Sequence, residues 1–248
     1  MSLSRSYNPL LLVLCLVRLI LVCGLTLAIL PVVLLARIYS RRLPHRAARV
    51  WAWLVLLCCG IRVLREGSDQ GWEARSVIIS NHLGYLDIPV ILVSLRIPFR
   101  FIADSGVFKV PVLGTAMRLC GYLPIWRSGH KRIRKTMQRA AGYVRDDLPV
   151  VIFPEGGINR SSDRDGYCRV LFGFEMIARE TGARVHQVTL CGTAEVQRTF
   201  CRLRHRTGCL IHETWLELPL SESRQERDDL AARIDTRSRE AMRRIRQQ

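Results

Sequence analysis

The stretch that decides the fold is Ile78-Ile79-Ser80-Asn81-His82-Leu83-Gly84-Tyr85-Leu86-Asp87. A β-branched run ends at Ser80, Leu83-Gly84 supply a turn, and apolar residues at helical spacing follow Asp87. This pattern predicts a buried strand, a turn and a helix. It places His82 at the carboxyl end of a strand, which is where open α/β sheets bind their ligands.

Asp87 stands five residues after His82, near the start of the expected helix. From there its carboxylate can reach one imidazole nitrogen. That contact would fix the tautomer and leave the other nitrogen as a general base, the role a carboxylate plays in serine-protease triads. A capping or surface pair is the common alternative for one histidine and one aspartate so close in sequence. The catalytic interpretation therefore needs a second signal.

The second signal is Val150-Val151-Ile152-Phe153-Pro154-Glu155-Gly156-Gly157, another apolar strand that ends in a polar turn. With Asn81, His82 and Asp87, its Phe-Pro-Glu-Gly resembles the glycerolipid acyltransferases, and in particular the 1-acyl-glycerol-3-phosphate (lysophosphatidate) acyltransferases. The His-x4-Asp spacing is weak alone, but it is specific when Phe-Pro-Glu-Gly follows in this order. The resemblance covers about residues 63 to 190.

The resemblance implies direct acyl transfer from acyl-CoA or acyl-carrier protein, with His82 as base, Asp87 as its orienting partner and no acyl-enzyme. Arg127 ends a strand-like segment and matches an arginine that holds the acceptor's phosphate. Glu155 is expected to hold acceptor hydroxyls or to position Arg127. The residues expected to bind substrate are Asn81, Arg127, Glu155, Gly156 and Arg160. No metal and no cofactor is expected.

Two departures from the family pattern concern the acceptor. Asp104 stands where the family commonly has a lysine, which removes positive charge where a phosphate would sit. The arginine after Phe-Pro-Glu-Gly also arrives late, at Arg160. An acceptor other than 1-acyl-sn-glycerol-3-phosphate, such as a lyso-ornithine lipid, is therefore an alternative. A catalytically inactive basic protein that binds membrane surfaces is an alternative of another class.

The 248 residues carry a formal net charge of +17, and the pI is near 10.4. Such a charge requires an anionic partner: a phospholipid surface, an acidic substrate or nucleic acid. Basic side chains beside an apolar anchor suit anionic lipid, at about 1 kcal/mol per residue near the surface. We therefore expect an anionic membrane surface as partner, and no nucleic acid.

The apolar anchor is Leu10 to Ala36, which is interrupted only by Arg18. Its charge-free part, from Leu19, is close to the roughly 20 residues of a membrane span. Arginines follow Ala36 in greater number than they precede it, so the positive-inside rule places the remainder on the cytoplasmic face. A second apolar run, Val50 to Ile61, is too short to span. It predicts an interfacial helix, a returning hairpin arm or a buried core helix.

From Val63 onward strand and helix patterns alternate, which predicts an α/β fold with a sheet flanked by helices. We expect a membrane-anchoring helix or helix pair at 1–61 and an α/β acyltransferase domain at 62–248. The expected strands are Ser76–Ser80, Phe99–Ala103, Tyr122–Trp126, Val150–Phe153, Val185–Leu190 and Leu210–Leu218. Helical spacing appears over 133–144 and 230–245, where Ser223 and Glu226 form a candidate capping box.

Overall fold

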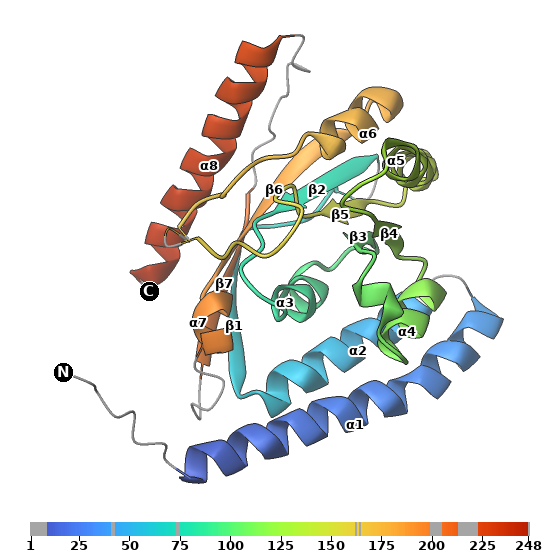
Figure 1. Cartoon of the computed structure of the whole chain (residues 1–248), viewed down its shortest axis with the longest axis vertical. Helices are drawn as coiled ribbons and strands as arrows, with labels where there is room; N and C mark the ends of the chain where they lie inside the picture. The colour runs from blue at the N-terminus through green and yellow to red at the C-terminus, as the bar shows by residue number, and fades with distance from the viewer. Residues whose placement is uncertain are drawn as a thin grey trace.

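A computed structural model describes residues 9–40, 43–72, 75–161, 163, 165–198, 205–212 and 223–247. Its centre is a seven-stranded sheet with the order β1-β7-β6-β2-β5-β3-β4 (Figure 1). The strands are β1 (Ile61–Glu66), β2 (Ser76–Ser80), β3 (Arg100–Asp104), β4 (Leu123–Ile125), β5 (Val150–Ile152), β6 (Arg184–Cys191) and β7 (His205–Ile211). The expected α/β fold is confirmed.

Strand β2 lies in the middle of the sheet, where it pairs in parallel with β5 and β6. All residues of β2 and β5 are buried. Parallel strands covered on both faces read as continuous apolar runs, which explains why the sequence located them well. Strand β7 runs antiparallel to β6 and parallel to β1.

The edge of the sheet that is formed by β1 and β7 was predicted poorly from the sequence. Strand β1 was missed, because its arginines and glutamate interrupt the apolar pattern of Ile61–Glu66. The strand expected at Leu210–Leu218 lies earlier, at His205–Ile211, and residues 213–218 lie outside the described part of the chain.

The capping box expected before the last helix is confirmed: Ser223 Oγ accepts from the Glu226 amide, and Glu226 Oε2 accepts from the Ser223 amide.

Helices cover both faces of the sheet. They are α1 (Pro9–Tyr39), α2 (Leu43–Cys58), α3 (Asp87–Ser94), α4 (Leu113–Leu119), α5 (His130–Arg145), α6 (Gly173–Thr181), α7 (Thr193–Arg198) and α8 (Arg224–Arg246). Successive strand residues point to opposite faces, so Ile78 packs with α2, α3 and α4, whereas Val77 and Ile79 pack with α5, α6 and α8. Helices α2 and α5 therefore lie on opposite faces of the sheet.

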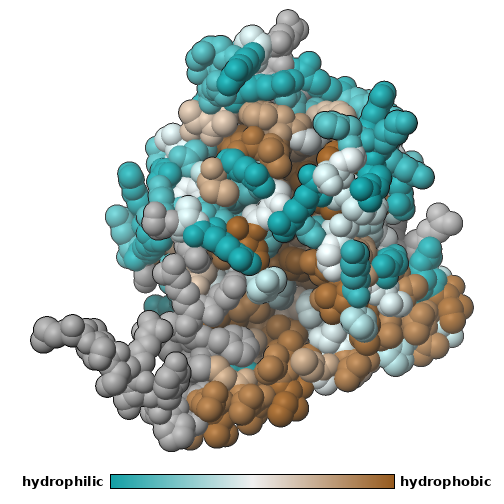
Figure 2. All heavy atoms as spheres, viewed as in Figure 1, coloured by the Kyte–Doolittle hydropathy of each residue, from teal (hydrophilic) through white to brown (hydrophobic). Residues whose placement is uncertain are grey.

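Helix α1 lies outside this arrangement, against α2 (Figure 1). It is long and apolar enough to cross a membrane by length and composition, and most of its apolar side chains are exposed. Figure 2 shows these apolar side chains gathered along the base of the molecule. The helix is consistent with membrane association. Helix α2 differs, because Ala52, Val55 and Leu56 are buried in the core of the α/β domain.

Candidate active site

The polar residues singled out from the sequence gather at one edge of the sheet. His82 follows β2, Glu155 follows β5, Asp104 ends β3 and Arg127 follows β4. These four strands are adjacent and parallel. Their carboxyl ends therefore present the four side chains along a single edge, as expected for an open α/β sheet.

His82 and Asp87 form a close pair. His82 Nδ1 lies 2.7 Å from Asp87 Oδ2, and the same oxygen accepts from the amides of Leu83 (2.6 Å) and Gly84 (2.8 Å). Asp87 is fully buried, whereas the His82 side chain keeps 15% of its surface exposed. Three donors on one oxygen hold the carboxylate in place at the first turn of α3. Because Nδ1 is engaged, Nε2 is the imidazole nitrogen available to a substrate.

The imidazole is also held from the side. The Phe153 ring stacks on it, with ring centroids 4.2 Å apart and an interplanar angle of 18°. Phe153 belongs to the recognised motif, but its contact with His82 was not expected from the sequence. The contact restricts the orientation of the ring, so the motif after β5 helps to orient the histidine after β2.

Glu155 is buried, with 1% of its surface exposed. Its Oε1 accepts from the His82 amide (2.8 Å) and its Oε2 from the Cys168 amide (3.1 Å). Burial raises the pKa of this carboxyl, although the hydrogen bonds from Cys168 and His82 oppose the shift. The expectation that Glu155 positions Arg127 or holds acceptor hydroxyls stays a prediction. Its carboxylate ties the backbone of His82 to the loop at Cys168.

Asn81 has a similar internal role. Its Nδ2 donates to the Leu190 carbonyl (2.9 Å) and its Oδ1 accepts from the Leu190 amide (2.7 Å). The side chain is fully buried. Both polar atoms of the amide thus join the ends of β2 and β6. The expected contact of Asn81 with substrate stays a prediction.

Arg127 lies at the open edge of the site. Its Nε donates to Asp104 Oδ2 at 2.8 Å, and the two side chains are 79% and 33% exposed. Burial opposes ionisation of Asp104, but hydrogen bonds from Arg127 and from the Gly106 amide outweigh it, so the pKa of Asp104 is lowered. A Cβ on Gly157 would lie 4.0 Å from Arg127 Nη2, so the structure brings Arg127 beside the turn after β5.

The turn itself requires glycine at Gly156. Its φ is +67°, and a Cβ there would approach Leu171 Cδ1 to 2.8 Å. Arg160 is exposed farther along the same loop. The preceding residue, Asn159, donates its amide to the His82 carbonyl (2.7 Å), which keeps this part of the loop next to the His82–Asp87 pair.

The sequence analysis missed the residues of α8 that bind the loop between β5 and α6. Asp235 Oδ1 accepts from the Tyr167 amide (2.7 Å), and Arg246 makes two hydrogen bonds to Asp165 (2.7 and 2.6 Å). These partners lie 68 and 81 residues apart in sequence. No local pattern could have revealed them.

The family model described as acyltransferase matches residues 60–191. The chain belongs to the acyltransferase family. The match includes β1 to β6 and the site residues from Asn81 to Cys168, so the resemblance noted from the sequence is confirmed.

Two plant relatives of this acyltransferase bear the same kind of name. It is 29% identical over 171 residues to "1-acyl-sn-glycerol-3-phosphate acyltransferase LPAT1, chloroplastic" of Arabidopsis thaliana. It is 31% identical over 175 residues to "1-acyl-sn-glycerol-3-phosphate acyltransferase BAT2, chloroplastic" of Brassica napus. Each match takes in 68% of this chain but only 47% and 48% of the relatives, so the chain spans about half their length.

A solved structure shares the fold of this acyltransferase. It is the 1-acyl-sn-glycerophosphate (LPA) acyltransferase PlsC from Thermotoga maritima. The TM-score is 0.73 at 18% sequence identity, over 94% of this chain and 97% of that one. The N-terminal helices are part of the described chain, so a likeness of this extent cannot be confined to the central sheet.

Proposed function

We propose that this acyltransferase moves a fatty acyl group from a thioester donor to the free hydroxyl of 1-acyl-sn-glycerol-3-phosphate, which gives phosphatidate. The observation that carries the proposal is the His82–Asp87 pair at the carboxyl edge of the sheet. The names of the plant relatives support the choice of acceptor.

In the proposed mechanism, His82 Nε2 takes the proton of the acceptor hydroxyl while the oxygen attacks the thioester carbonyl. The carbon–sulfur bond then breaks, and the thiol leaves with a proton from the imidazolium. Buried Asp87 stabilises the imidazolium and keeps the ring in the productive tautomer. General base catalysis contributes about 10² to 10⁴-fold, and holding both substrates together adds to this.

The remaining edge of the site would hold the acceptor's head group. Arg127 offers its guanidinium there, and the Gly156-Gly157 turn lets backbone amides approach an anion closely. Arg160 is close enough in sequence to add charge from the same loop. Asn81 and Glu155 would act indirectly, by holding the strand ends and the backbone of His82 in place.

We also propose that residues 1–61 anchor the protein and that 62–248 form the catalytic domain on the cytoplasmic face. The exposed apolar side chains of α1 support the anchor, and the arginines that follow it support the orientation. Attraction to anionic lipid would add to the binding. Nucleic acid is not expected as a partner.

A second acceptor class has one observation in its favour. Asp104 neutralises much of the charge that Arg127 could offer to a phosphate. A lysolipid with a less anionic head group, such as a lyso-ornithine lipid, would be repelled less by Asp104. The donor is either acyl-CoA or acyl-carrier protein.

The test is acyl transfer by the full-length protein in lipid vesicles, with isotope-labelled acyl donors and a panel of lysolipids. Mass spectrometry of the products should show labelled phosphatidate from 1-acyl-sn-glycerol-3-phosphate, and His82→Ala should abolish it. Preferential labelling of lyso-ornithine lipid would select the second acceptor. If no lysolipid gives a labelled product, the proposed acyl transfer is contradicted, and an inactive protein that binds membrane surfaces is favoured.

A further inference from the structure

Helix α5 carries a concentration of basic side chains. Its exposed surface holds six basic side chains, and no acidic residue occurs anywhere in the helix. Arg145, the last of them, pairs with Glu180, and we call the other five the α5 basic surface: Lys131, Arg132, Arg134, Lys135 and Arg139. Within the described part of the chain, none of them forms an ion pair.

Other arginines on the same face of the sheet have carboxylate partners. Arg145, at the end of α5, pairs with Glu180 at 2.6 Å, and Arg179 on α6 pairs with Glu175 at 2.8 Å. On α8, Arg239 contacts both Asp163 and Asp235. The α5 basic surface thus differs from these arginines, because within the described part of the chain its five cations have no carboxylate partner.

The unpaired charges oppose the stability of their own helix. Lys131 and Arg132 lie in the first turn, where the positive end of the helix dipole disfavours cations. Lys131, Lys135 and Arg139 follow one another at i, i+4 spacing, so like charges repel along the surface. Within the described part of the chain no carboxylate offsets this repulsion, whereas an anionic partner would.

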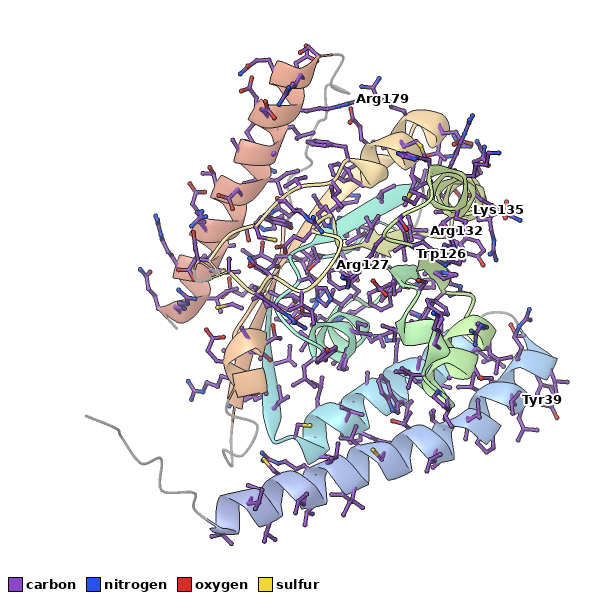
Figure 3. The ribbon with its side chains drawn as sticks, viewed as in Figure 1. Tyr39, Trp126, Arg127, Arg132, Lys135 and Arg179 are labelled. Carbon is purple, nitrogen blue, oxygen red and sulfur yellow. The ribbon has the colours of Figure 1, made fainter. Side chains whose placement is uncertain are left out.

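The position of the surface argues against lipid as that partner. The buried side of α5 packs with α6 and α8, whereas α2 and α1 belong to the opposite face of the sheet. A bilayer that holds α1 would therefore meet the other side of the domain. Figure 3 shows Tyr39, at the end of α1, well separated from Arg132 and Lys135.

The surface is nevertheless connected to the site. In Figure 3, Arg127, Trp126, Arg132 and Lys135 appear in this order from the middle of the domain toward its right side. The Arg132 guanidinium lies 5.7 Å from the centre of the Trp126 ring, which links the first turn of α5 to the end of β4. The α5 basic surface therefore adjoins the end of β4, where Arg127 lies at the same carboxyl edge of the sheet as His82.

The shape of the surface indicates the size of the partner. From Lys131 to Arg139 the helix extends about 12 Å, at 1.5 Å per residue. These side chains project from a convex helix, whereas small-molecule sites are concave. An extended, convex row of cations fits the acidic face of a protein better than the phosphates of one coenzyme molecule.

We propose that the α5 basic surface docks an acidic acyl-carrier protein, so that the donor is the protein-bound thioester. The inference rests on the proposed function. The carrier's acidic face would lie on α5, and its phosphate-linked arm would pass Arg127 to bring the thioester carbonyl to His82. Transfer breaks the carbon–sulfur bond, forms the ester bond and leaves the carrier's thiol protonated.

The test compares two donors with the same acyl chain, acyl-carrier protein and acyl-CoA, in vesicles of zwitterionic lipid. The variant is Arg134→Glu/Lys135→Glu in the full-length protein. Its KM for acyl-carrier protein should rise about tenfold or more, because like charges then face the acidic partner. Its kinetic constants for acyl-CoA should stay within about twofold. A matched control, Arg233→Glu/Arg243→Glu, makes the same charge change at exposed positions of α8 and should alter neither donor.

A binding measurement separates this inference from the proposed function. Fluorescently labelled acyl-carrier protein should bind the wild type and His82→Ala alike, and should bind the α5 variant at least tenfold more weakly. Equal loss with both donors would overturn the docking proposal, as would an equal effect of the α8 control or unchanged carrier binding. If carrier binding follows this pattern but no acyl transfer occurs, the docking surface stands and the proposed function fails.

Discussion

The turn after β2 and the end of β4 are built in opposite ways, although both contribute to the same edge of the sheet. At the β2 turn, buried Asp87 and Glu155 hold His82 through its ring and its amide. At the end of β4, Arg127 is held by one exposed ion pair with Asp104. Buried polar networks cost much to disturb, whereas exposed ion pairs contribute little.

This difference indicates which part of the site can change in evolution. The base requires one geometry, since proton transfer depends on the position and tautomer of a single ring. Head-group recognition tolerates adjustment, because the charges that would meet it are exposed and lie on loops. Substitutions in the two regions should therefore differ in size and in the kinetic constant that they alter.

The largest effect is expected from His82→Ala. Loss of the general base should lower kcat about 10² to 10⁴-fold, while the protein stays folded because His82 contributes one stacked ring to the core. Initial rates and a thermal unfolding curve check this. Near-normal kcat in a folded variant would show that His82 is structural.

Asp87→Asn should lower kcat about 10²-fold and leave the acceptor's KM nearly unchanged, because the amide can still accept from the Leu83 and Gly84 backbone but cannot stabilise the imidazolium. Steady-state kinetics separates the two constants. A rise in KM alone would instead place Asp87 in substrate binding.

Glu155→Gln should lower activity about tenfold and the free energy of unfolding by about 1–3 kcal/mol, because one buried backbone amide then loses its acceptor. Urea denaturation in detergent measures the second effect. Full stability together with full activity would mean that an amide can replace the carboxylate.

The Glu155→Gln variant also tests how the free energy of unfolding depends on pH. Burial raises the pKa of Glu155, so the folded protein protonates this group more readily than the unfolded chain does. Its contribution to stability is therefore complete below the ordinary value of 4.5 and is lost as pH rises through the folded-state pKa. The free energy of unfolding of the wild type minus that of Glu155→Gln should fall as pH increases from about 4.5. A difference that stays constant or grows over this range would contradict the raised pKa.

The smallest effects are expected for substitutions of Arg127 and Asp104 at the end of β4, and these two should change the acceptor's KM in opposite directions. Arg127→Ala should raise the KM for a phosphate-bearing acceptor about two- to fivefold, since the side chain is largely exposed. Asp104→Asn should lower it by a similar factor, because a competing anion is removed. The donor's KM should not change in either variant. Changes of the same sign would show that Asp104 positions Arg127 for binding.

The parts of the fold that were predicted correctly depend on local patterns. The apolar run of β2 needed no knowledge of its neighbours, and the observed strand coincides with the expected Ser76–Ser80. The Ser223–Glu226 capping box was likewise readable from spacing alone. Strand β1 was missed because its stability comes from pairing with β7, which lies far away in sequence, and not from its own pattern.

The same limit applies to the site. The His82–Asp87 contact is local and was anticipated from a five-residue spacing. The partners of Glu155 and Asn81 were not, because each joins segments that meet only through the sheet. Spacing predicts which side chains approach the edge, but the order of the strands decides whether a polar side chain faces a substrate or a backbone amide.

The pairing of β1 with β7 has a consequence for the order of events during synthesis. Strand β1 emerges from the ribosome directly after α1 and α2, yet its neighbour in the sheet is β7, which is made much later. An unpaired edge strand exposes hydrogen-bonding groups that favour aggregation. Until β7 is made, β1 stays linked through α2 to α1, the apolar helix that is long enough to cross a bilayer. Early capture of α1 by the membrane would keep nascent chains apart until β7 completes the sheet.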